Sequence, residues 1–168
     1  FNIRKYGNGK LLIKPSKKSQ KKFAEATHEV IYNMRAAKQT DVIGKLNPKI
    51  TGWANYFRYV SSKVVFSKLD HIIFSQLKRW AIRRHHNKSL KWIADKYWHH
   101  DGKRGWIFGI KGKDKKGQET VFRLNQLAQT PILRHTKIKS EANPFDPRYD
   151  EYFKQRHLCR TRPLKCSA

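Results

Sequence analysis

The sequence predicts a mainly α-helical fold with a small α+β part: an N-terminal β-hairpin, a bundle of three to four helices, and then a small mixed basic module with a second β-hairpin. Apolar residues recur at helical spacing through the long segments between residues 19 and 97. Short strand-like segments flank Gly-containing turns near the start and after residue 101. Five Trp, seven Tyr and nine Phe are enough large side chains for a real core.

The first elements are separated by clear turn signals. Residues 1–6 and 10–14 flank Gly7-Asn8-Gly9, which predicts a hairpin, and Pro15-Ser16 then interrupts the pattern. We expect a helix over about 19–38 that buries one face. That face carries Phe23, Thr27, Val30, Ile31 and Met34.

The most informative segment is LNPKITGWANYFRYVSS, residues 46–62. Thr40-Asp41 begins a short helical turn before it, and Asn47 as N-cap with Pro48 at the first helical position predicts a separate helix over about 48–61. Its apolar stripe predicts which side is buried. The stripe consists of Ile50, Trp53, Phe57 and Val60.

Two further helices and a hairpin follow. Ser67 is expected to cap a helix over about 68–86, and Ser89 a shorter one through Tyr97. Their inward residues should be Leu69, Ile73, Leu77 and Trp80 in the first, and Leu90, Ile93 and Tyr97 in the second. Residues 104–110 and 118–124 are strand-like around a Gly/Lys loop, Asp146-Pro147 begins a last short helix, and the tail from Leu158 should be loose.

The charge balance points to a polyanionic partner. The chain has 38 Lys and Arg against 12 Asp and Glu, a formal net charge of +26, and a bound polyanion would relieve this self-repulsion. No apolar run approaches the roughly 20 residues that span a membrane, so we expect no membrane association. A nucleic acid is the predicted partner, with an acidic membrane or a merely basic surface as alternatives.

Basic and aromatic residues interleave as they do in proteins that hold phosphates and stack bases. Trp92, Trp98 and Trp106 are further candidates for stacking, whereas Trp53, Phe57 and Trp80 fit the core. The alternative for every basic residue is a solvated surface or the matching of a helix dipole. The predicted RNA- or DNA-binding residues are Lys17, Lys18, Lys21, Lys22, Asn55, Tyr56, Arg58, Tyr59, Lys78, Arg79, Arg83, Arg84, His85, Lys88, Lys91, Lys113, Lys115, Lys116, Arg134, His135 and Lys137.

The sequence predicts neither catalytic residues nor a metal site in this chain. It contains no carboxylate pair near a strand turn and no Gly-rich phosphate loop. The pairs His85-His86 and His99-His100 are adjacent in sequence, and adjacent side chains on a helix point about 100° apart, so neither pair could chelate one ion. Cys159 and Cys166 are expected to be free thiols. We predict no cofactor, and whether the chain belongs to an enzyme stays open.

The residues nevertheless resemble a known family. Four segments are together similar to the C-terminal part of group II intron reverse transcriptase–maturases. They are FNIRKY with LLIKPSKKS, LNPKITGWANYFRY, FSKLDHIIFSQLKRWAIRRHHNKSLKWIADKYW and ILRHTKIKSEANPFDPRYDEYFKQR. The resemblance covers about residues 1–157. It implies a palm hairpin at 1–18, a maturase-specific thumb at 19–100, a basic DNA-binding region at 101–157 and a loose tail at 158–168.

The resemblance also implies partners and a role. The partners would be group II intron RNA and target DNA, and the role would be in RNA splicing and intron mobility. Mg²⁺ would serve only the polymerase part of the full-length protein and the intron RNA. A homodimer is an option in the full-length family, and the location would be bacterial cytoplasm or an organellar matrix or stroma. Two alternatives stay open: a non-catalytic fragment of an active reverse transcriptase that contacts the template–primer duplex, and a degenerate remnant.

Overall fold

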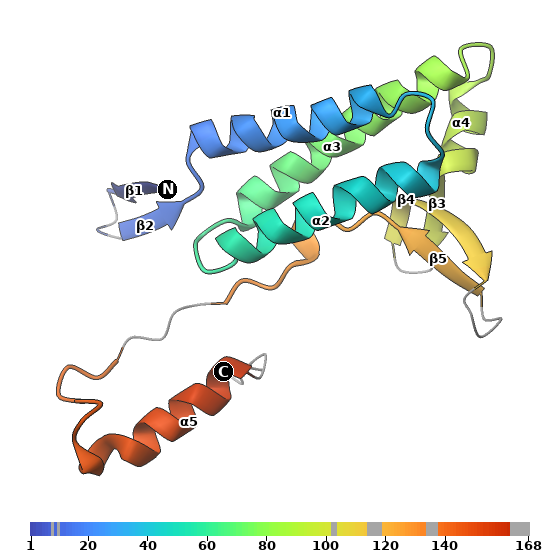
Figure 1. The fold of residues 1–168 in the computed structure, drawn as a ribbon. Coiled ribbons are helices and arrows are strands. Elements are labelled where there is room, and N and C mark those ends of the chain that lie inside the picture. Colours follow the sequence, from blue (N-terminus) through green and yellow to red (C-terminus); the bar gives the residue numbers. More distant parts are fainter. Residues whose placement is uncertain (8, 10, 102–103, 114–118, 134–137, 162–168) are drawn as a thin grey trace. The chain divides into compact units, whose positions relative to one another are not determined.

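The computed structural model describes residues 1–161 apart from 8, 10, 102–103, 114–118 and 134–137. The chain divides into two compact units, Phe1–Ile132 and Leu133–Ala168. The first unit holds an N-terminal hairpin, four helices and a three-stranded sheet, and the second holds a short 3₁₀ turn and one helix (Figure 1). The predicted mainly α fold with two small antiparallel sheets is confirmed.

The N-terminal hairpin pairs β1 (Asn2–Lys5) with β2 (Leu11–Lys14). The strands are antiparallel, and Lys5 lies opposite Leu11. Gly9 has a φ of 75°, a conformation that glycine adopts without strain, and its N–H donates to the Tyr6 carbonyl at 2.9 Å. The turn signal at Gly7 and Gly9 therefore correctly predicted this hairpin.

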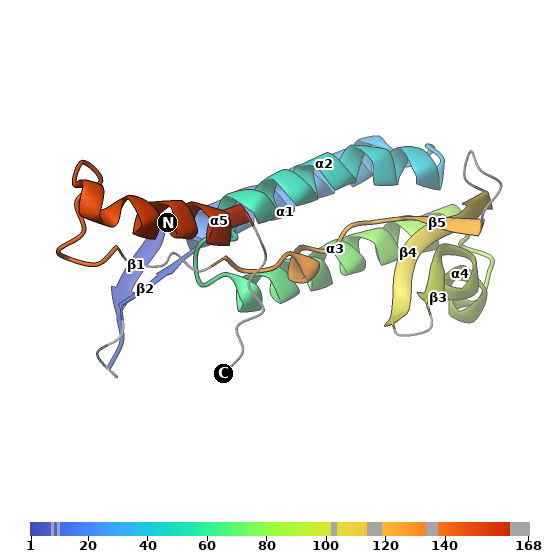
Figure 2. The same ribbon diagram turned by 90° about the horizontal axis from the view of Figure 1, so that it is seen from below.

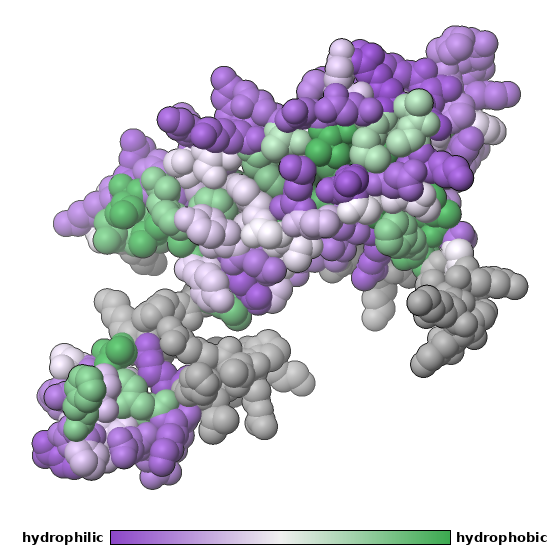
Figure 3. All heavy atoms as spheres, viewed as in Figure 1, coloured by the Kyte–Doolittle hydropathy of each residue, from purple (hydrophilic) through white to green (hydrophobic). Residues whose placement is uncertain are grey.

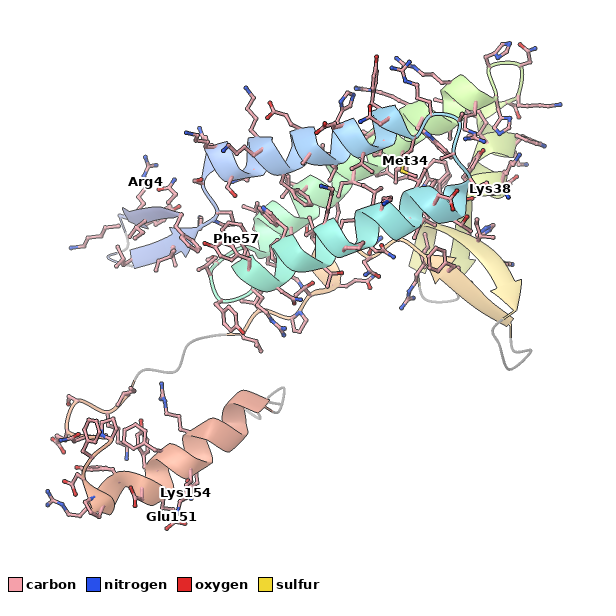
Figure 4. The ribbon with its side chains drawn as sticks, in the orientation of Figure 1. Arg4, Met34, Lys38, Phe57, Glu151 and Lys154 are labelled. Carbon is pink, nitrogen blue, oxygen red and sulfur yellow. The ribbon has the colours of Figure 1, made fainter. Side chains whose placement is uncertain are left out.

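Three long helices form the core of the first unit. They are α1 (Lys17–Asn33), α2 (Gln39–Phe57) and α3 (Lys63–Arg84). The predicted stripe of α3 (Leu69, Ile73, Leu77 and Trp80) is buried against α1 and α2. Figure 4 shows Met34 and Lys38 near the α1–α2 connection and Phe57 at the other end of α2. Periodicity correctly predicted which faces are inside.

The predicted boundaries of α2 are wrong. Helix α2 runs without a break from Gln39, so Asn47 is not an N-cap and Pro48 lies inside the helix. Val42, Ile43 and Leu46 are fully buried, and this burial holds the segment before Pro48 in the same helix. The Asn47 side chain makes tertiary bonds instead: its Nδ2 donates to the Arg123 carbonyl at 3.1 Å and its Oδ1 accepts from the Asn125 N–H at 2.8 Å.

The predicted start of α3 is also wrong. The helix begins at Lys63, and the buried Ser62 hydroxyl donates to the Phe57 carbonyl at 2.8 Å. Ser67 lies within the helix, where its hydroxyl donates to the Lys63 carbonyl at 3.3 Å. In the sequence, a serine one turn inside a helix, such as Ser67, cannot be distinguished from a serine that caps the helix. The burial of Phe66 holds that residue within the helix, so α3 begins before Ser67. Helix α1 likewise begins before the predicted residue 19, because Ser16 caps it by accepting from the Ser19 N–H at 3.2 Å.

Helix α4 (Leu90–Tyr97) leads directly into the sheet. Ser89 caps it as predicted, but Leu90 is 60% exposed, so only Ile93 and Tyr97 of the predicted inward set are buried. The sheet has the order β3-β4-β5, with β3 (Trp98–Asp101), β4 (Arg104–Lys113) and β5 (Glu119–Arg123) antiparallel. Strand β3 was not predicted. Figure 2 shows this sheet beside α4, near one end of the long helices.

The segment after β5 returns along α3. It contains a short 3₁₀ helix, η1 (Leu127–Gln129), whose first N–H groups are capped by Asp70 of α3. The two Asp70 oxygens each accept one backbone N–H at 2.8 Å, from Leu127 and from Ala128. Desolvation raises the pKa of this carboxyl, and the two backbone hydrogen bonds and Lys63 oppose that rise.

The second unit contains η2 (Pro147–Tyr149) and α5 (Asp150–Thr161). Asp146 caps η2 by accepting the Arg148 N–H at 3.0 Å and also pairs with the Arg148 guanidinium at 2.8 Å, which lowers the pKa of the Asp146 carboxyl. Figure 4 shows Glu151 and Lys154 close together on α5. The helix continues four residues into the tail expected to be loose, and residues 162–168 lie outside the described part. Among the described helices, none is long and apolar enough to cross a membrane.

Candidate nucleic-acid interface

A shallow groove of about 380 Å³ runs between α1 and α2. Its lining comes from one face of each helix: Ser19, Lys22, Phe23 and Ala26 from α1, and Lys49, Gly52, Trp53 and Tyr56 from α2. The spacing of 49, 52, 53 and 56 is that of a single helical face. Hydrophobic residues are visible between the two helices in Figure 3, with hydrophilic ones along α1. We call this feature the α1–α2 groove.

Aromatic rings form the floor of the groove. The Trp53 ring is stacked on Phe23 at 4.9 Å, and it also packs against Phe57 at 4.4 Å and Phe66 at 5.8 Å. Trp53 packs against the core as predicted but remains half-buried, so one part of the indole faces the groove. Tyr56 is 61% exposed, and Phe1 of the hairpin stacks on its ring at 5.5 Å. Such rings are platforms on which a base can stack.

The edges of the groove are basic. Lys22 and Lys49 are exposed and line it from the two helices, and no carboxylate is among its lining residues, all of which the structure describes. Lys17, Lys18 and Lys21 continue the charge along the first turns of α1, where Lys21 reaches Glu25 at 3.8 Å. Lys49 was not among the predicted contacts. Its position four residues before Trp53 and seven before Tyr56 could have identified it.

The remaining predicted contacts of this segment lie at the end of α2. Asn55 and Tyr59 are exposed, and Arg58 is half-buried. The Arg58 guanidinium donates to Asn55 Oδ1 at 3.4 Å, whereas its Nε is buried and has no hydrogen-bond partner within the described part of the chain. Such an atom is costly to leave unpaired.

The basic end of α3 splits into two kinds of side chain. Lys78, Arg79 and Arg83 are exposed, as a phosphate-binding role requires. Arg84 is directed inward: its guanidinium donates to the Arg35 carbonyl at 3.0 Å and to the Ala37 carbonyl, and it lies 4.7 Å above the Trp80 ring. Arg84 therefore ties the α1–α2 connection to α3, a role that the sequence did not indicate.

His85 is likewise engaged within the fold. Its Nε2 lies 2.9 Å from the Tyr97 hydroxyl, and its ring meets Trp92 edge-on at 4.9 Å. Desolvation lowers the pKa of His85, and the positive charges of Lys96, Arg84 and Lys88 lower it further. Its pKa therefore lies below the ordinary value of 6.5, which disfavours a cationic imidazole at pH 7. Lys88 and Lys91 are exposed.

Several predicted contacts lie on residues whose side chains the structure does not describe. These are Lys113, Lys115, Lys116, Arg134, His135 and Lys137. Within the described residues, no group of three or more His, Cys, Asp or Glu is arranged to hold a metal ion.

Comparison with known proteins identifies the helical part of the first unit. Residues 20–98, which extend from α1 through α4, match the family model of the group II intron, maturase-specific domain. A search of curated proteins finds no match to the chain. The matched residues contain both sides of the α1–α2 groove apart from Ser19. Residues 20–98 thus match the group II intron maturase-specific domain, which is the C-terminal maturase part that the sequence resembles.

Proposed function

We propose that this chain binds group II intron RNA through the α1–α2 groove and thereby assists splicing. The observation that carries the proposal is the combination of an aromatic floor at Trp53 and Tyr56 with basic edges at Lys22 and Lys49. This pairing of base-stacking rings with phosphate-binding cations is typical of proteins that hold unpaired RNA. The maturase-specific family of these same helices supports intron RNA as the ligand.

The proposed mechanism is a charged clamp. Ammonium groups along α1 and α2 would neutralise phosphates of the folded intron, while Tyr56 stacks on an unpaired base. Because the folded RNA brings more phosphates together than the open RNA does, the clamp favours the folded RNA. Catalysis of splicing belongs to the RNA in this proposal, so the chain only binds and positions it.

Contact with target DNA during intron mobility is the second part of the proposal. It rests on the basic character of the segment after residue 101, where the sequence places Lys111, Lys113, Lys115 and Lys116 close together. Duplex DNA offers the same phosphates as RNA but no unpaired bases, so stacking at the groove should distinguish the two ligands. The alternative role of the α1–α2 groove is binding to a template–primer duplex.

The test compares two double variants that remove equal charge. Lys22→Gln with Lys49→Gln changes the groove, and Lys45→Gln with Lys68→Gln changes two exposed lysines that do not line it. We expect the groove variant to lose about tenfold in affinity for intron RNA, because each of the two exposed ion pairs contributes up to about 1 kcal/mol and 1.4 kcal/mol is tenfold. The control should lose less than threefold. Filter binding with intron RNA, an unrelated RNA and duplex DNA measures this.

Two results would contradict the proposal. Equal losses in the groove variant and its control would mean that only net charge matters. Tighter binding to duplex DNA than to intron RNA would favour the template–primer role instead. Melting curves of both variants establish that each remains folded.

A further inference from the structure

A second pocket, separate from the α1–α2 groove, lies where α3, α4 and the sheet meet. Its volume is about 600 Å³, within the range of about 300–1,000 Å³ usual for ligand sites. Phe74 and Ile82 of α3 and Leu90 of α4 give it apolar walls, and the buried Trp98, whose ring meets Phe74 at 5.5 Å, also lines it. An apolar pocket of this size is not needed to explain the fold.

Trp106 is held at this pocket by a strained backbone. Its φ is 64°, which is unfavourable for so bulky a residue, and its side chain is 54% exposed. The strain coincides with an irregularity in the sheet: His99 pairs with Ile107, whereas Asp101 pairs with Arg104, so β4 carries one extra residue between these pairs. A bulge of this kind changes the direction in which a side chain points, and here the affected side chain is that of Trp106, which lines the pocket.

The charges at the pocket indicate what it holds. Lys78 of α3 and Lys91 of α4 are exposed and line it from two sides. Asp95 supplies one acceptor, of the kind that receives an N–H from a base. Two cations beside an apolar, aromatic cavity complement a nucleotide, whose flat base is apolar on its faces and whose phosphates are anionic. An apolar protein segment would complement the walls but not the two lysines.

We propose that this pocket takes an unpaired nucleobase of an RNA strand. The base stacks on Trp106, and the phosphates on either side of it contact Lys78 and Lys91. The inference rests on the RNA binding proposed above and adds to it a site for a base extruded from the strand. It also explains why the chain retains a strained tryptophan: the ring must stand at the mouth of the pocket rather than on the regular strand.

The experiment uses the full chain and three RNA probes of equal phosphate number. They are a 12-nucleotide single strand, the same strand with its central five positions abasic, and a 12-nucleotide hairpin whose loop positions are abasic, so that all its bases are paired. Trp106→Gly removes the ring, and glycine adopts the positive φ without strain, so the variant should melt at or above the temperature of the parent. Ala94→Phe fills the same pocket from α4 without changing β4. Phe122→Ala, which removes an exposed ring from β5 outside the pocket, is the matched control.

We expect both pocket variants to lose five- to fiftyfold in affinity for the intact single strand and less than twofold for the abasic strand and the hairpin. One stacked base contributes about this much. Phe122→Ala should bind all three probes as the parent does. A strand carrying 4-thiouridine should crosslink, in the parent, to the peptide that contains Trp106.

Three outcomes would overturn the inference. The first is that the pocket variants bind the intact strand as tightly as the parent does, and the second is that the crosslinks map only to α1 and α2. The third is that light scattering shows a dimer of the parent that Trp106→Gly abolishes. This last result would assign the pocket to a second copy of the chain. All three outcomes leave the proposed function intact, because the hairpin can still bind through Lys22 and Lys49 in a salt-sensitive way. If the parent protein does not bind the hairpin in this way, the proposed function is contradicted, and the inference about the pocket is contradicted with it.

Discussion

At the scale of single residues, Asn47 joins the middle of α2 to the end of the sheet. Its amide donates to the Arg123 carbonyl and accepts from the Asn125 N–H, so both of its ends are used. We expect Asn47→Asp to lower the free energy of unfolding by about 1–3 kcal/mol, because a carboxylate oxygen would face the Arg123 carbonyl without a proton between them. Urea denaturation measures this.

Asn55→Asp is the control for that change, since Asn55 is exposed near the end of the same helix. It should alter the free energy of unfolding by less than about 0.5 kcal/mol. If Asn47 were instead a helix cap, aspartate would serve as well as asparagine, and Asn47→Asp would be neutral. A neutral result would thus restore the two-helix interpretation of this segment.

His85 gives a prediction about pH. Its pKa in the folded state is lowered below the ordinary value of 6.5, so the unfolded chain takes up the proton first as the pH falls. Protonation of this residue therefore destabilises the fold as the pH drops through 6.5, and above that pH it has no such effect. We expect the free energy of unfolding to decrease more between pH 7.5 and pH 5.5 in the parent than in His85→Gln. Equal decreases would show that other histidines account for the pH dependence.

At the scale of elements, the end of α3 combines a binding surface with a structural clamp. Arg79 and Arg83 are exposed, whereas Arg84 donates to two carbonyls of the α1–α2 connection. We expect Arg79→Gln with Arg83→Gln to leave the melting temperature unchanged and to reduce the slope of log K against log salt by up to about two. Arg84→Gln should lower the melting temperature, since the half-buried Ala37 carbonyl and the exposed Arg35 carbonyl both lose a charged donor.

Melting curves and salt-titrated RNA binding distinguish the two roles. A stable Arg84→Gln protein with a reduced salt slope would reverse the assignment and return Arg84 to the phosphate contacts. An unchanged slope in the Arg79→Gln and Arg83→Gln protein would leave these two side chains as solvated surface, and the lysines of α1 would then carry most of the binding.

At the scale of the whole molecule, the net charge of +26 sets opposite responses of folding and binding to salt. Salt screens the repulsion among the cations, so the melting temperature should rise between 50 and 500 mM NaCl. The same salt should weaken RNA binding, with a slope of log K against log salt near −5 if about six phosphates of paired RNA are neutralised, at about −0.9 each. Differential scanning fluorimetry and filter binding on one preparation measure both. A flat binding response would refute the charged clamp.

Much of this architecture could be predicted from the sequence because it depends on local patterns. The 3.6-residue period in α3 identified Leu69, Ile73, Leu77 and Trp80 as its buried face, and Ser89 correctly marked the start of α4. The Gly7–Gly9 turn fixed the hairpin, and the excess of lysine and arginine singled out the cations that line the groove and the second pocket, apart from Lys49.

Contacts between distant residues decided the rest. Asn47 and Pro48 carry the sequence signature of a helix start, yet burial of Val42, Ile43 and Leu46 keeps the helix continuous through them. Arg84 could not be told from Arg83 by sequence, because only the position of the α1–α2 connection provides it with acceptors. The sequence by itself determined the helical faces, the turns and the charge. The tertiary structure alone decided where α2 and α3 begin, which arginine is structural, and how a bulge in β4 brings Trp106 to a pocket between helices, because each of these depends on groups far apart in the chain.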